Sequence, residues 1–243
     1  MGLDRLRRHR GARPARRGAA VLRAGAAVAR LPGHRRERCR RSRRRTDGRG
    51  TGRVRERRPG SVTRLVLVRH GRTAWNLEGR AQGHTDVGLD DVGRAQAAAV
   101  APVLAGLRPS VLWSSDLARA RETAAEVAAA TGLTARYDAR LREFDVGERA
   151  GLTVAEFAER FPESYESWRS GHITGLVPGA ETPQQVVDRV VPALTEIWSA
   201  IRPGETTVVI SHGACLKVAL VAFLGWPPEL GRSLRGLENC GWI

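Results

Sequence analysis

The stretch LVLVRHGRTAWN, residues 65–76, begins with four apolar and mostly branched residues, which arginine, histidine and glycine then follow. An unbroken apolar run of this kind is typical of a strand that is covered on both faces of a parallel sheet. Ligands of open parallel sheets bind outside the carboxyl ends of the strands. Arg69 and His70 therefore stand where such a sheet would present functional side chains.

The residues that follow alternate between strand-like runs and alanine-rich, helix-like runs. Strands are expected at 65–68, 111–115, 134–138 and 206–211, and helices at 88–107, 116–132, 183–201 and 214–225. This alternation predicts an α/β fold on a mostly parallel sheet. Ser115 or Asp116 is expected to cap the helix that runs to Gly132, and Thr182 before Pro183 predicts another helix start.

Residues 149–180 interrupt the alternation. They contain Phe157, Phe161, Tyr165 and Trp168 at spacings of four, four and three, together with a proline and several glycines. This spacing predicts one apolar face over two short helices. Two interpretations stay open: an insert that only packs against the core, and a lid whose rigid aromatic side chains contact a ligand.

The formal charge of +16 is distributed unevenly over the 243 residues. Residues 1–60 contain 22 arginines and four acidic residues, whereas the rest of the chain contains 19 basic and 21 acidic residues. The segment 1–61 has almost no large apolar side chains, so we expect a disordered extension there. A nearly neutral globular domain is expected over 62–243.

Three roles compete for this arginine-rich extension. Dense arginine suits electrostatic binding to nucleic acid or to an acidic membrane. The run AAVLRAGAAVA resembles a targeting segment, although Arg23 interrupts it. The third role, which we favour, is upstream sequence translated from a wrongly assigned start, because 40 arginines against one lysine indicate a GC-rich genome. On this hypothesis the native protein begins near Val62.

Cysteine usage and hydropathy narrow the class of protein. Cys39, Cys215 and Cys240 form neither a disulfide framework nor a zinc-binding spacing. No apolar run reaches the roughly 18 residues that a transmembrane helix needs. We expect a cytoplasmic protein without a membrane span.

Polar side chains also follow two other predicted strands. Arg119 lies on the helix after the second strand, and His212-Gly213 follows the last one. His70-Gly71 and His212-Gly213 meet if their strands are neighbours in the sheet. Glycine after each histidine would let backbone and substrate approach closely.

Two histidines and two arginines without metal-ligand spacing suit chemistry on a phosphate group. Arginine binds phosphate through forked, charge-assisted hydrogen bonds, and a neutral imidazole can attack phosphorus. The second histidine and backbone N–H groups can stabilise the charge on the phosphoryl oxygens. The leaving oxygen needs a proton, for which Glu143 is the best candidate, with Asp145 and Glu148 as rivals.

Six segments occur in order along the globular part: LVRHGRTAWN (67–76), QGHTDVGLDDVGRAQA (82–97), SSDLARARETA (114–124), LREFDVGE (141–148), PGAET (178–182) and ISHG (210–213). In these segments the chain resembles the histidine phosphatase superfamily, in its phosphoglycerate-mutase-like branch. Six ordered segments are a highly specific signal. The resemblance implies a three-layer αβα fold with a mostly parallel central sheet and a small helical lid over 149–180.

The resemblance also implies roles for individual residues. His70 would take the phosphoryl group as a phosphohistidine, and Glu143 would protonate the leaving oxygen and then activate water. Arg69, Arg119 and His212 would complete the catalytic set. The implied substrate-binding residues are Arg69, His70, Gly71, Arg72, Thr73, Asn76, Gln82, Gly83, Arg119 and His212. Asn76 could instead cap a turn and Gln82 could be a plain loop residue; no cofactor and no metal ion are implied.

The chain departs from the family pattern at two places. Many relatives have Trp-Glu-Gly after the acid-bearing loop, whereas this chain has Arg149-Ala150-Gly151, which puts the placement of Glu143 in doubt. The family usually ends in a full strand. This chain stops at LENCGWI, so we expect a short last strand at 239–243 and an unprotected sheet edge or a frayed end.

These observations predict a metal-independent phosphomonoesterase that acts on a small sugar or glycerate phosphate. The alternative enzyme is a phosphoglycerate mutase, which is disfavoured because only 68 residues separate Glu143 from His212 and the insert is more aromatic than basic. A third alternative is a non-catalytic phosphate-binding module with a nucleic-acid-binding arginine tail. A homodimer is left open.

Overall fold

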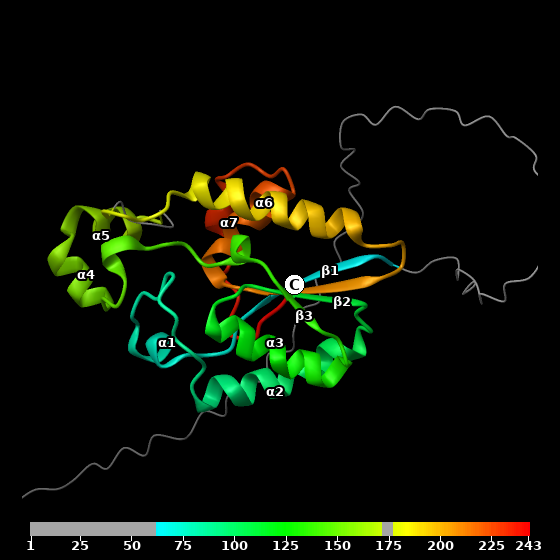
Figure 1. Ribbon diagram of the computed structural model, residues 1–243. Coiled ribbons are helices and arrows are strands. Elements are labelled where there is room, and N and C mark those ends of the chain that lie inside the picture. Colours follow the sequence, from blue (N-terminus) through cyan, green and yellow to red (C-terminus); the bar gives the residue numbers. More distant parts are fainter. Residues whose placement is uncertain (1–61, 172–176) are drawn as a thin grey trace, which may run out of the picture. The chain divides into compact units, whose positions relative to one another are not determined.

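The structure is a computed structural model that describes residues 62–171 and 177–243 (Figure 1). The extension expected over 1–61 lies outside these residues. Within the described part, four parallel strands form one sheet in the order β1-β4-β2-β3. The strands are β1 (Arg64–Arg69), β2 (Val111–Ser114), β3 (Ala135–Tyr137) and β4 (Thr206–Ser211), as the apolar runs predicted.

The pairing of β1 with β4 fixes the position of both predicted catalytic histidines. Arg69 at the end of β1 lies opposite Ser211 at the end of β4. His70 and His212 are each the next residue, and the backbone N–H of His70 donates to the carbonyl of Ser211 at 3.0 Å. Two segments that are far apart in sequence therefore deliver histidine at the same level of one sheet edge.

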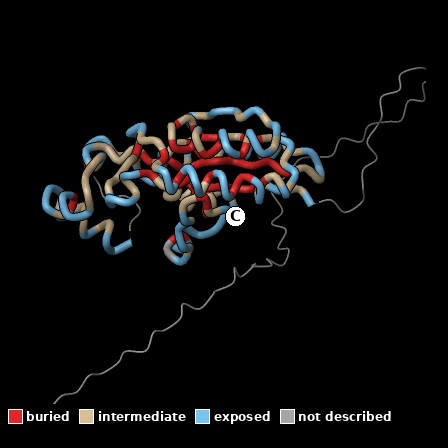
Figure 2. The backbone as a smooth tube through the Cα atoms, turned by 90° about the horizontal axis from the view of Figure 1, so that it is seen from below, coloured by how far each residue is buried: buried red, intermediate tan, exposed pale blue. Residues whose placement is uncertain are grey.

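Helices cover both faces of the sheet. α2 (Asp91–Gly106) and α3 (Ala118–Thr131) lie on one face, and α6 (Pro183–Ala200) and α7 (Gly213–Phe223) lie on the other (Figure 1). Alternate strand residues point to opposite faces of a sheet. Val66 and Val68 accordingly pack with α2 and α3, whereas Leu67 packs with α6 and α7. The buried residues run as a band through the strands, which confirms the three-layer αβα fold (Figure 2).

The helix boundaries agree with the sequence at most ends. Thr182 caps α6 through a capping box with Gln185, and Pro183 is the first helical residue. Gly132 ends α3 with a φ of 71°, in the left-handed region that favours glycine.

The N-cap expected for α3 is wrong. The cap residue is Leu117, without a side-chain cap hydrogen bond. The Asp116 carboxylate instead accepts two hydrogen bonds from the Arg142 guanidinium, at 2.7 and 2.5 Å. The Ser115 hydroxyl is directed to His212. A tertiary partner holds Asp116, whereas Ser115 contacts His212 and also accepts from the backbone N–H of Leu117 at 3.4 Å, without capping the helix.

The outer edge of β1 is covered by the end of the chain. Val68 forms an antiparallel bridge with Trp242, and the N–H of Leu67 donates to the carbonyl of Ile243 at 2.9 Å. The N–H of Arg69 also donates to the carbonyl of Gly241. The expectation of an unprotected edge or a frayed end is therefore wrong, because even a short segment satisfies the edge of β1.

Short elements connect the layers. They are α1 (Ala74–Glu78), α4 (Val154–Arg160), α5 (Pro162–Arg169), α8 (Leu230–Ser233) and two 3₁₀ turns, η1 (Ala139–Leu141) and η2 (Gly147–Arg149). Figure 1 shows α1, α4 and α5 beyond the carboxyl ends of β1 and β4.

The predicted aromatic face over two short helices is present. The Phe157 ring, which is fully buried, lies within 6.4 Å of the rings of Phe161, Tyr165 and Trp168. These contacts join α4 to α5 as one small cluster.

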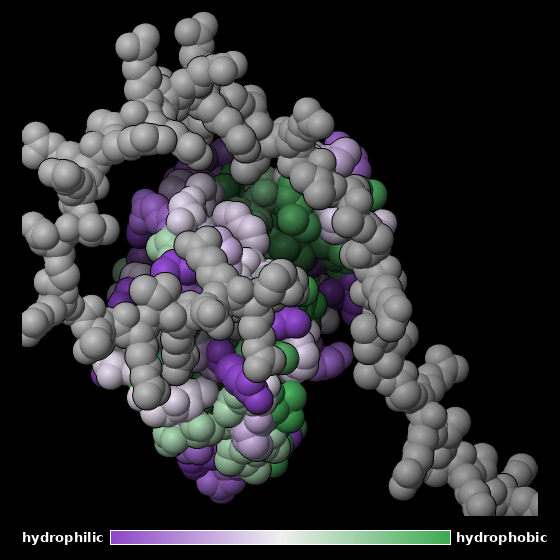
Figure 3. Space-filling view, turned by 90° about the vertical axis from the view of Figure 1, so that its right-hand side faces the viewer, coloured by the Kyte–Doolittle hydropathy of each residue, from purple (hydrophilic) through white to green (hydrophobic). Residues whose placement is uncertain are grey.

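The described surface carries the usual mixture of side chains. Figure 3 shows purple hydrophilic residues over much of one side of the molecule, with the strongest green hydrophobic residues gathered mainly in its upper part. Trp198, Trp226 and Trp242 are among the large apolar residues that are exposed. Scattered exposed apolar residues of this kind are common on folded proteins.

A close backbone contact holds the loop after β1 against α2. A Cβ atom on Gly71 would lie 2.5 Å from the carbonyl oxygen of Gly93, and a Cβ on Gly93 would lie 1.9 Å from that of Arg72. Neither glycine leaves room for a side chain. Gly71 was expected to let backbone and substrate approach closely, and the backbone that approaches it is that of α2.

This contact predicts that Gly93→Ala is destabilising. The added methyl group meets backbone that cannot rotate away, and overpacking of this kind costs about 1–3 kcal/mol, or more where the clash is severe. Urea unfolding monitored by circular dichroism measures the free energy of unfolding.

Gly106→Ala is the matched control on the same helix, because nothing lies within 4 Å of the added Cβ. It should be neutral or more stable by up to about 1 kcal/mol. Equal stability of the two variants would contradict the role given to Gly93.

Candidate active site

His70 and His212 converge at the carboxyl ends of β1 and β4. Their ring centroids are 5.1 Å apart. Both side chains and that of Arg119 are buried, with exposed fractions of 3%, 0% and 1%. The convergence that the sequence argument required is therefore present.

His70 is held in the form that suits a nucleophile. Its Nδ1 lies 2.7 Å from the carbonyl oxygen of Gly71. A carbonyl only accepts, so Nδ1 carries the proton and Nε2 of the neutral ring keeps its lone pair. Burial and the positive charges of Arg119 and Arg69 lower the pKa of His70 well below its ordinary value. The ring is thus neutral at neutral pH.

Arg119 is fixed by three acceptors. Its Nε donates to Nδ1 of His212 at 3.2 Å, and its two terminal nitrogens donate to the carbonyls of Thr85 and Gly83 at 3.0 and 2.7 Å. No carboxylate of the described residues lies within ion-pair distance of this guanidinium. Its charge is thus available to a bound anion.

His212 is engaged at both ring nitrogens. Because Nδ1 accepts from Arg119, Nε2 carries the proton and donates to the Ser115 hydroxyl at 2.8 Å. Burial, Arg119 and His70 lower the pKa of His212 well below its ordinary value. His212 therefore braces Arg119 as a neutral ring, and its predicted direct contact with phosphate stays a prediction.

Arg69 lies between β1 and the start of α7. One terminal nitrogen donates to the carbonyl of Leu237 at 2.7 Å, and its buried Nε has no hydrogen-bond partner. A Cβ on Gly213 would lie 3.2 Å from that Nε. The second glycine of the histidine–glycine pairs thus allows the close approach of the Arg69 side chain, where the sequence suggested close approach of backbone and substrate.

The Glu143 carboxylate, on the loop after η1, lines the same cavity as His70 and Arg119. It accepts hydrogen bonds from the backbone N–H groups of Ala214 and Cys215, at 3.1 and 2.8 Å, at the start of α7. Its rivals are engaged elsewhere: Asp145 with His84 at 3.7 Å, and Glu148 with an exposed arginine of α4. Of the three acids, Glu143 alone lines the cavity described below.

The loop that carries Glu143 is held independently of Arg149-Ala150-Gly151. The Arg189 guanidinium on α6 donates to the carbonyls of Arg140, Arg142 and Glu143 at 2.7–2.9 Å and pairs with Glu181 at 2.8 Å. Departure from the family pattern at 149–151 therefore has not removed Glu143 from the site.

These groups surround a cavity of about 230 Å³. Seven of the predicted site residues line it, and they come from the end of β1, from α1, from the start of α3 and from loops between elements. They are Arg69, His70, Asn76, Gln82, Gly83, Arg119 and Glu143. Asn76 also accepts from the N–H of its capping partner Thr73, so the capping role and the site role coexist.

The other predicted residues lie behind the cavity lining. The N–H groups of Gly71, Arg72 and Thr73 all donate within the protein, to the side chains of Thr123, Gln96 and Asn76. The Arg72 guanidinium pairs with Asp90 at 2.8 Å. These residues shape the loop, and their contact with substrate stays a prediction.

Some lining residues were not singled out as binding residues by the sequence argument, among them three with large polar or aromatic side chains. Arg80, Arg149 and Trp168 line the cavity on the side of the insert. The departure of Arg149 from the family pattern and the aromatic spacing that includes Trp168 were the available signals. Arg80 gave none, because it follows α1 in an ordinary loop.

Other reactive groups lie away from this chemistry. Burial raises the pKa of the Cys215 thiol to about 12, so it is a poor nucleophile. In the described part of the chain, no group of three or more His, Cys, Asp or Glu is placed to hold a metal ion. The same residues include no helix long and apolar enough to cross a bilayer.

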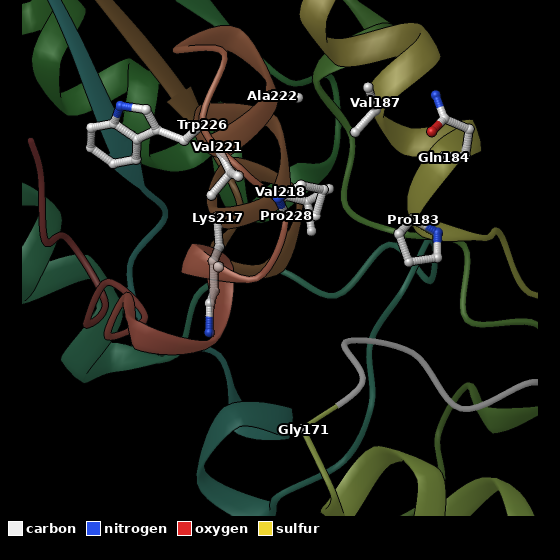
Figure 4. Close-up of a pocket in the computed structure, with 11 residues that line it drawn as sticks. Gly171, Pro183, Gln184, Val187, Lys217, Val218, Val221, Ala222, Trp226 and Pro228 are labelled. Carbon is white, nitrogen blue, oxygen red and sulfur yellow. The ribbon is translucent and has the colours of Figure 1, made fainter.

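A second cavity of about 340 Å³ lies beside α6 and α7 (Figure 4). Val187, Val218, Val221 and Trp226 contribute to its mostly apolar lining, and Lys217 is its charged residue. The described residues of its lining include neither imidazole nor carboxylate. The polar cavity at the strand ends is therefore the candidate active site, although it is smaller.

Such a site, at the carboxyl ends of a parallel three-layer fold, defines a phosphate-processing enzyme that works through histidine. The sequence profile of the histidine phosphatase superfamily, branch 1, matches residues 65–243. The chain belongs to the histidine phosphatase superfamily.

Individual relatives agree with this assignment. A glucosyl-3-phosphoglycerate phosphatase of Mycolicibacterium vanbaalenii is 35% identical over 188 residues, 75% of this chain and 83% of that protein. A probable phosphoglycerate mutase of Citrobacter koseri is 36% identical over 183 residues, 74% of this chain and 82% of that protein. A mycobacterial glucosyl-3-phosphoglycerate phosphatase in complex with VO3 has a TM-score of 0.67 at 35% identity, covering 73% and 90% of the two chains.

The two histidines predict a loss of stability in mild acid. Their pKa values in the folded state lie well below the ordinary value of 6.5. Below pH 6.5 the unfolded chain therefore binds protons that the folded chain does not. The free energy of unfolding should fall as the pH drops through this region, by at most about 1.4 kcal/mol per pH unit for each histidine.

Urea unfolding at about pH 7.5 and about pH 5.5 measures this loss. His70→Asn is the informative variant because its amide can still donate to the Gly71 carbonyl but does not titrate. It should lose less stability over the interval than the unsubstituted protein. An equal loss in the two proteins would contradict the assignment for His70.

Proposed function

We propose that the protein hydrolyses phosphomonoesters through a phosphohistidine formed on Nε2 of His70, without a metal ion. The observation that carries the proposal is the hydrogen bond between His70 Nδ1 and the Gly71 carbonyl, which leaves Nε2 as the free nitrogen. His70, Arg69 and Arg119 line one cavity, so an anion attracted by the arginines meets this nitrogen.

The first half of the reaction transfers the phosphoryl group to the enzyme. The Nε2 lone pair attacks phosphorus, and the bond from phosphorus to the ester oxygen breaks. Arg69 and Arg119 stabilise the charge on the phosphoryl oxygens. The Arg119 side chain is buried and that of Arg69 is partly buried, so water screens their charges less than at an open surface. Glu143 gives its proton to the leaving oxygen, and the alcohol departs.

The second half releases phosphate. Glu143, now a carboxylate, takes a proton from a water molecule that attacks phosphorus, and the bond from phosphorus to Nε2 breaks. Inorganic phosphate leaves, and both His70 and Glu143 return to their starting forms. His212 contributes by holding the Arg119 guanidinium through its Nδ1 throughout.

The substrate class follows from the relatives and from the cavity. Two of the similar proteins are glucosyl-3-phosphoglycerate phosphatases, which act on the phosphate of a sugar–glycerate compound. A cavity of about 230 Å³ suits a small metabolite. A sugar or glycerate phosphate is therefore the proposed substrate, and the insert with α4 and α5 acts as a lid over it.

The alternative is phosphoglycerate mutase activity, since relatives bearing that name are equally similar. A mutase would return the phosphoryl group to its substrate, and its turnover of 3-phosphoglycerate would depend on a bisphosphoglycerate primer. Release of inorganic phosphate without primer favours the hydrolase.

Further expectations from the sequence stay predictions: a cytoplasmic location, a homodimer, and nucleic-acid binding by the arginine-rich segment 1–61. That segment lies outside the described residues.

His70→Ala should abolish hydrolysis of p-nitrophenyl phosphate, by at least about 10³-fold in kcat, because no other side chain in the cavity replaces the nucleophile. EDTA should leave the unsubstituted enzyme unchanged. Inorganic phosphate release measures both. Turnover by His70→Ala, or activity that is lost with EDTA and restored by a metal ion, would refute the mechanism.

Glu143→Gln should slow phosphorylation of the enzyme far more for substrates with poor leaving groups than for substrates with good ones. A nitrophenolate departs readily without a proton, whereas an alkoxide does not, so general acid catalysis contributes about 10²–10⁴-fold only for alkyl phosphates. Comparing kcat/KM for p-nitrophenyl phosphate and glycerol 3-phosphate measures the difference, because kcat/KM reports phosphorylation of the enzyme and not the later attack of water. An equal decrease for both substrates would remove Glu143 from the acid role.

A further inference from the structure

Arg149 lies on the insert side of the active-site cavity. It is the last residue of η2, and it lines the same cavity as His70 and Arg119. It occupies the first position of the segment 149–151, where the chain departs from the family pattern. The family pattern therefore gives no role for Arg149, and the side chains around it indicate one.

Two aromatic rings hold the Arg149 guanidinium. Its central carbon lies 4.2 Å from the centroid of the Phe157 ring and 4.7 Å from that of Trp168. A cation held over aromatic faces is stabilised by their negative potential. The contacts come from α4 and α5, so the insert positions this cation at the cavity.

No anion of the described chain neutralises Arg149. No carboxylate lies within ion-pair distance, and its buried Nε has no hydrogen-bond partner. Burial lowers the pKa of Arg149, yet a guanidinium stays charged in proteins. Arg80, the neighbouring arginine of the lining, differs because it pairs with both Glu78 and Glu156.

The charges of the lining side chains indicate which anionic groups a bound substrate would carry. Among the described residues, the lining arginines without a carboxylate partner are Arg69, Arg119 and Arg149. A phosphomonoester supplies about two negative charges at neutral pH. In the proposed mechanism the phosphoryl group occupies Arg69 and Arg119, so Arg149 is left without an anion.

We propose that Arg149 binds a carboxylate on the leaving group of the substrate, so that the preferred substrates are phosphomonoesters of hydroxy acids. This inference rests on the proposed function, because it assumes that Arg69 and Arg119 hold the phosphoryl group. Arg149 is then a specificity residue: the planar guanidinium binds a carboxylate with two parallel hydrogen bonds. The aromatic rings behind it keep it at the cavity when no substrate is bound.

Two substrates that differ only at the group in question test the proposal. 3-Phosphoglycerate carries a carboxylate where glycerol 3-phosphate carries a hydroxymethyl group. The unsubstituted enzyme should show a kcat/KM for 3-phosphoglycerate about 10- to 100-fold above that for glycerol 3-phosphate, the range expected for a hydrogen-bonded charge pair. Arg149→Met should reduce this ratio to about one, and Arg149→Lys should retain part of it.

The ratio separates carboxylate binding from a structural role. If Arg149 only joins the insert to the core, Arg149→Met lowers kcat/KM for both substrates alike and the ratio stays high, which would overturn the proposal. Arg160→Met is the matched control, because Arg160 also lies over a phenylalanine ring but pairs with Glu148 away from the cavity. It should leave both values unchanged.

The unsubstituted enzyme provides a test even if Arg149→Met does not fold. Equal kcat/KM for the two substrates would by itself overturn the proposal. Hydrolysis of p-nitrophenyl phosphate that depends on His70 reports the proposed function separately. If that activity is present but 3-phosphoglycerate is not preferred, the proposed carboxylate site is contradicted. The proposed phosphatase mechanism is not.

Discussion

The parallel pairing of β1 with β4 is the constraint on which the site depends. It sets Arg69 opposite Ser211, so that the next residues bring two imidazoles to 5.1 Å from each other. A shift of one residue in this register would turn the side chains of one strand to the other face of the sheet. The buried valines and leucines of β1 and β4 prevent that shift, because each face packs against its own pair of helices. The packing of the core therefore fixes the β1–β4 register, and this register fixes the positions of the two histidines.

Around this pair, the protein holds most of its charged groups with backbone atoms. Arg119 donates to two loop carbonyls, Arg189 donates to three carbonyls of the acid-bearing loop, and Glu143 accepts from the N–H groups that begin α7. Backbone partners fix position without neutralising charge. The cavity therefore keeps a positive field for an anionic substrate, and the neutral His70 is a consequence of that field and of burial. The aromatic insert extends the field with Arg149, which links the overall shape of the site to substrate choice.

Much of this could be predicted before the structure was known. The strands and main helices follow from apolar runs and helical spacing, and His70, Arg119 and Glu143 follow from their places after strands. Local capping was less predictable: Asp116 pairs with Arg142 and leaves α3 without a side-chain cap. Close approach to Gly71 was expected, but not that the approaching backbone would be that of α2. In each case a partner distant in sequence offers more than the local interaction, and no local pattern reveals that partner.

The sequence by itself determined the fold class, the family and the residues that carry the chemistry, because periodicity and motif spacing are properties of neighbouring residues. Only the tertiary structure decided how those residues divide the work. It placed His212 behind Arg119 with both nitrogens engaged and paired Arg80 with two glutamates. It set Arg149 over two aromatic rings, with no carboxylate partner in the part of the chain that the structure describes. The physical reason is that burial, charge pairing and proton position depend on which distant segments come together, and these decide whether an arginine or histidine stabilises the protein or meets the substrate.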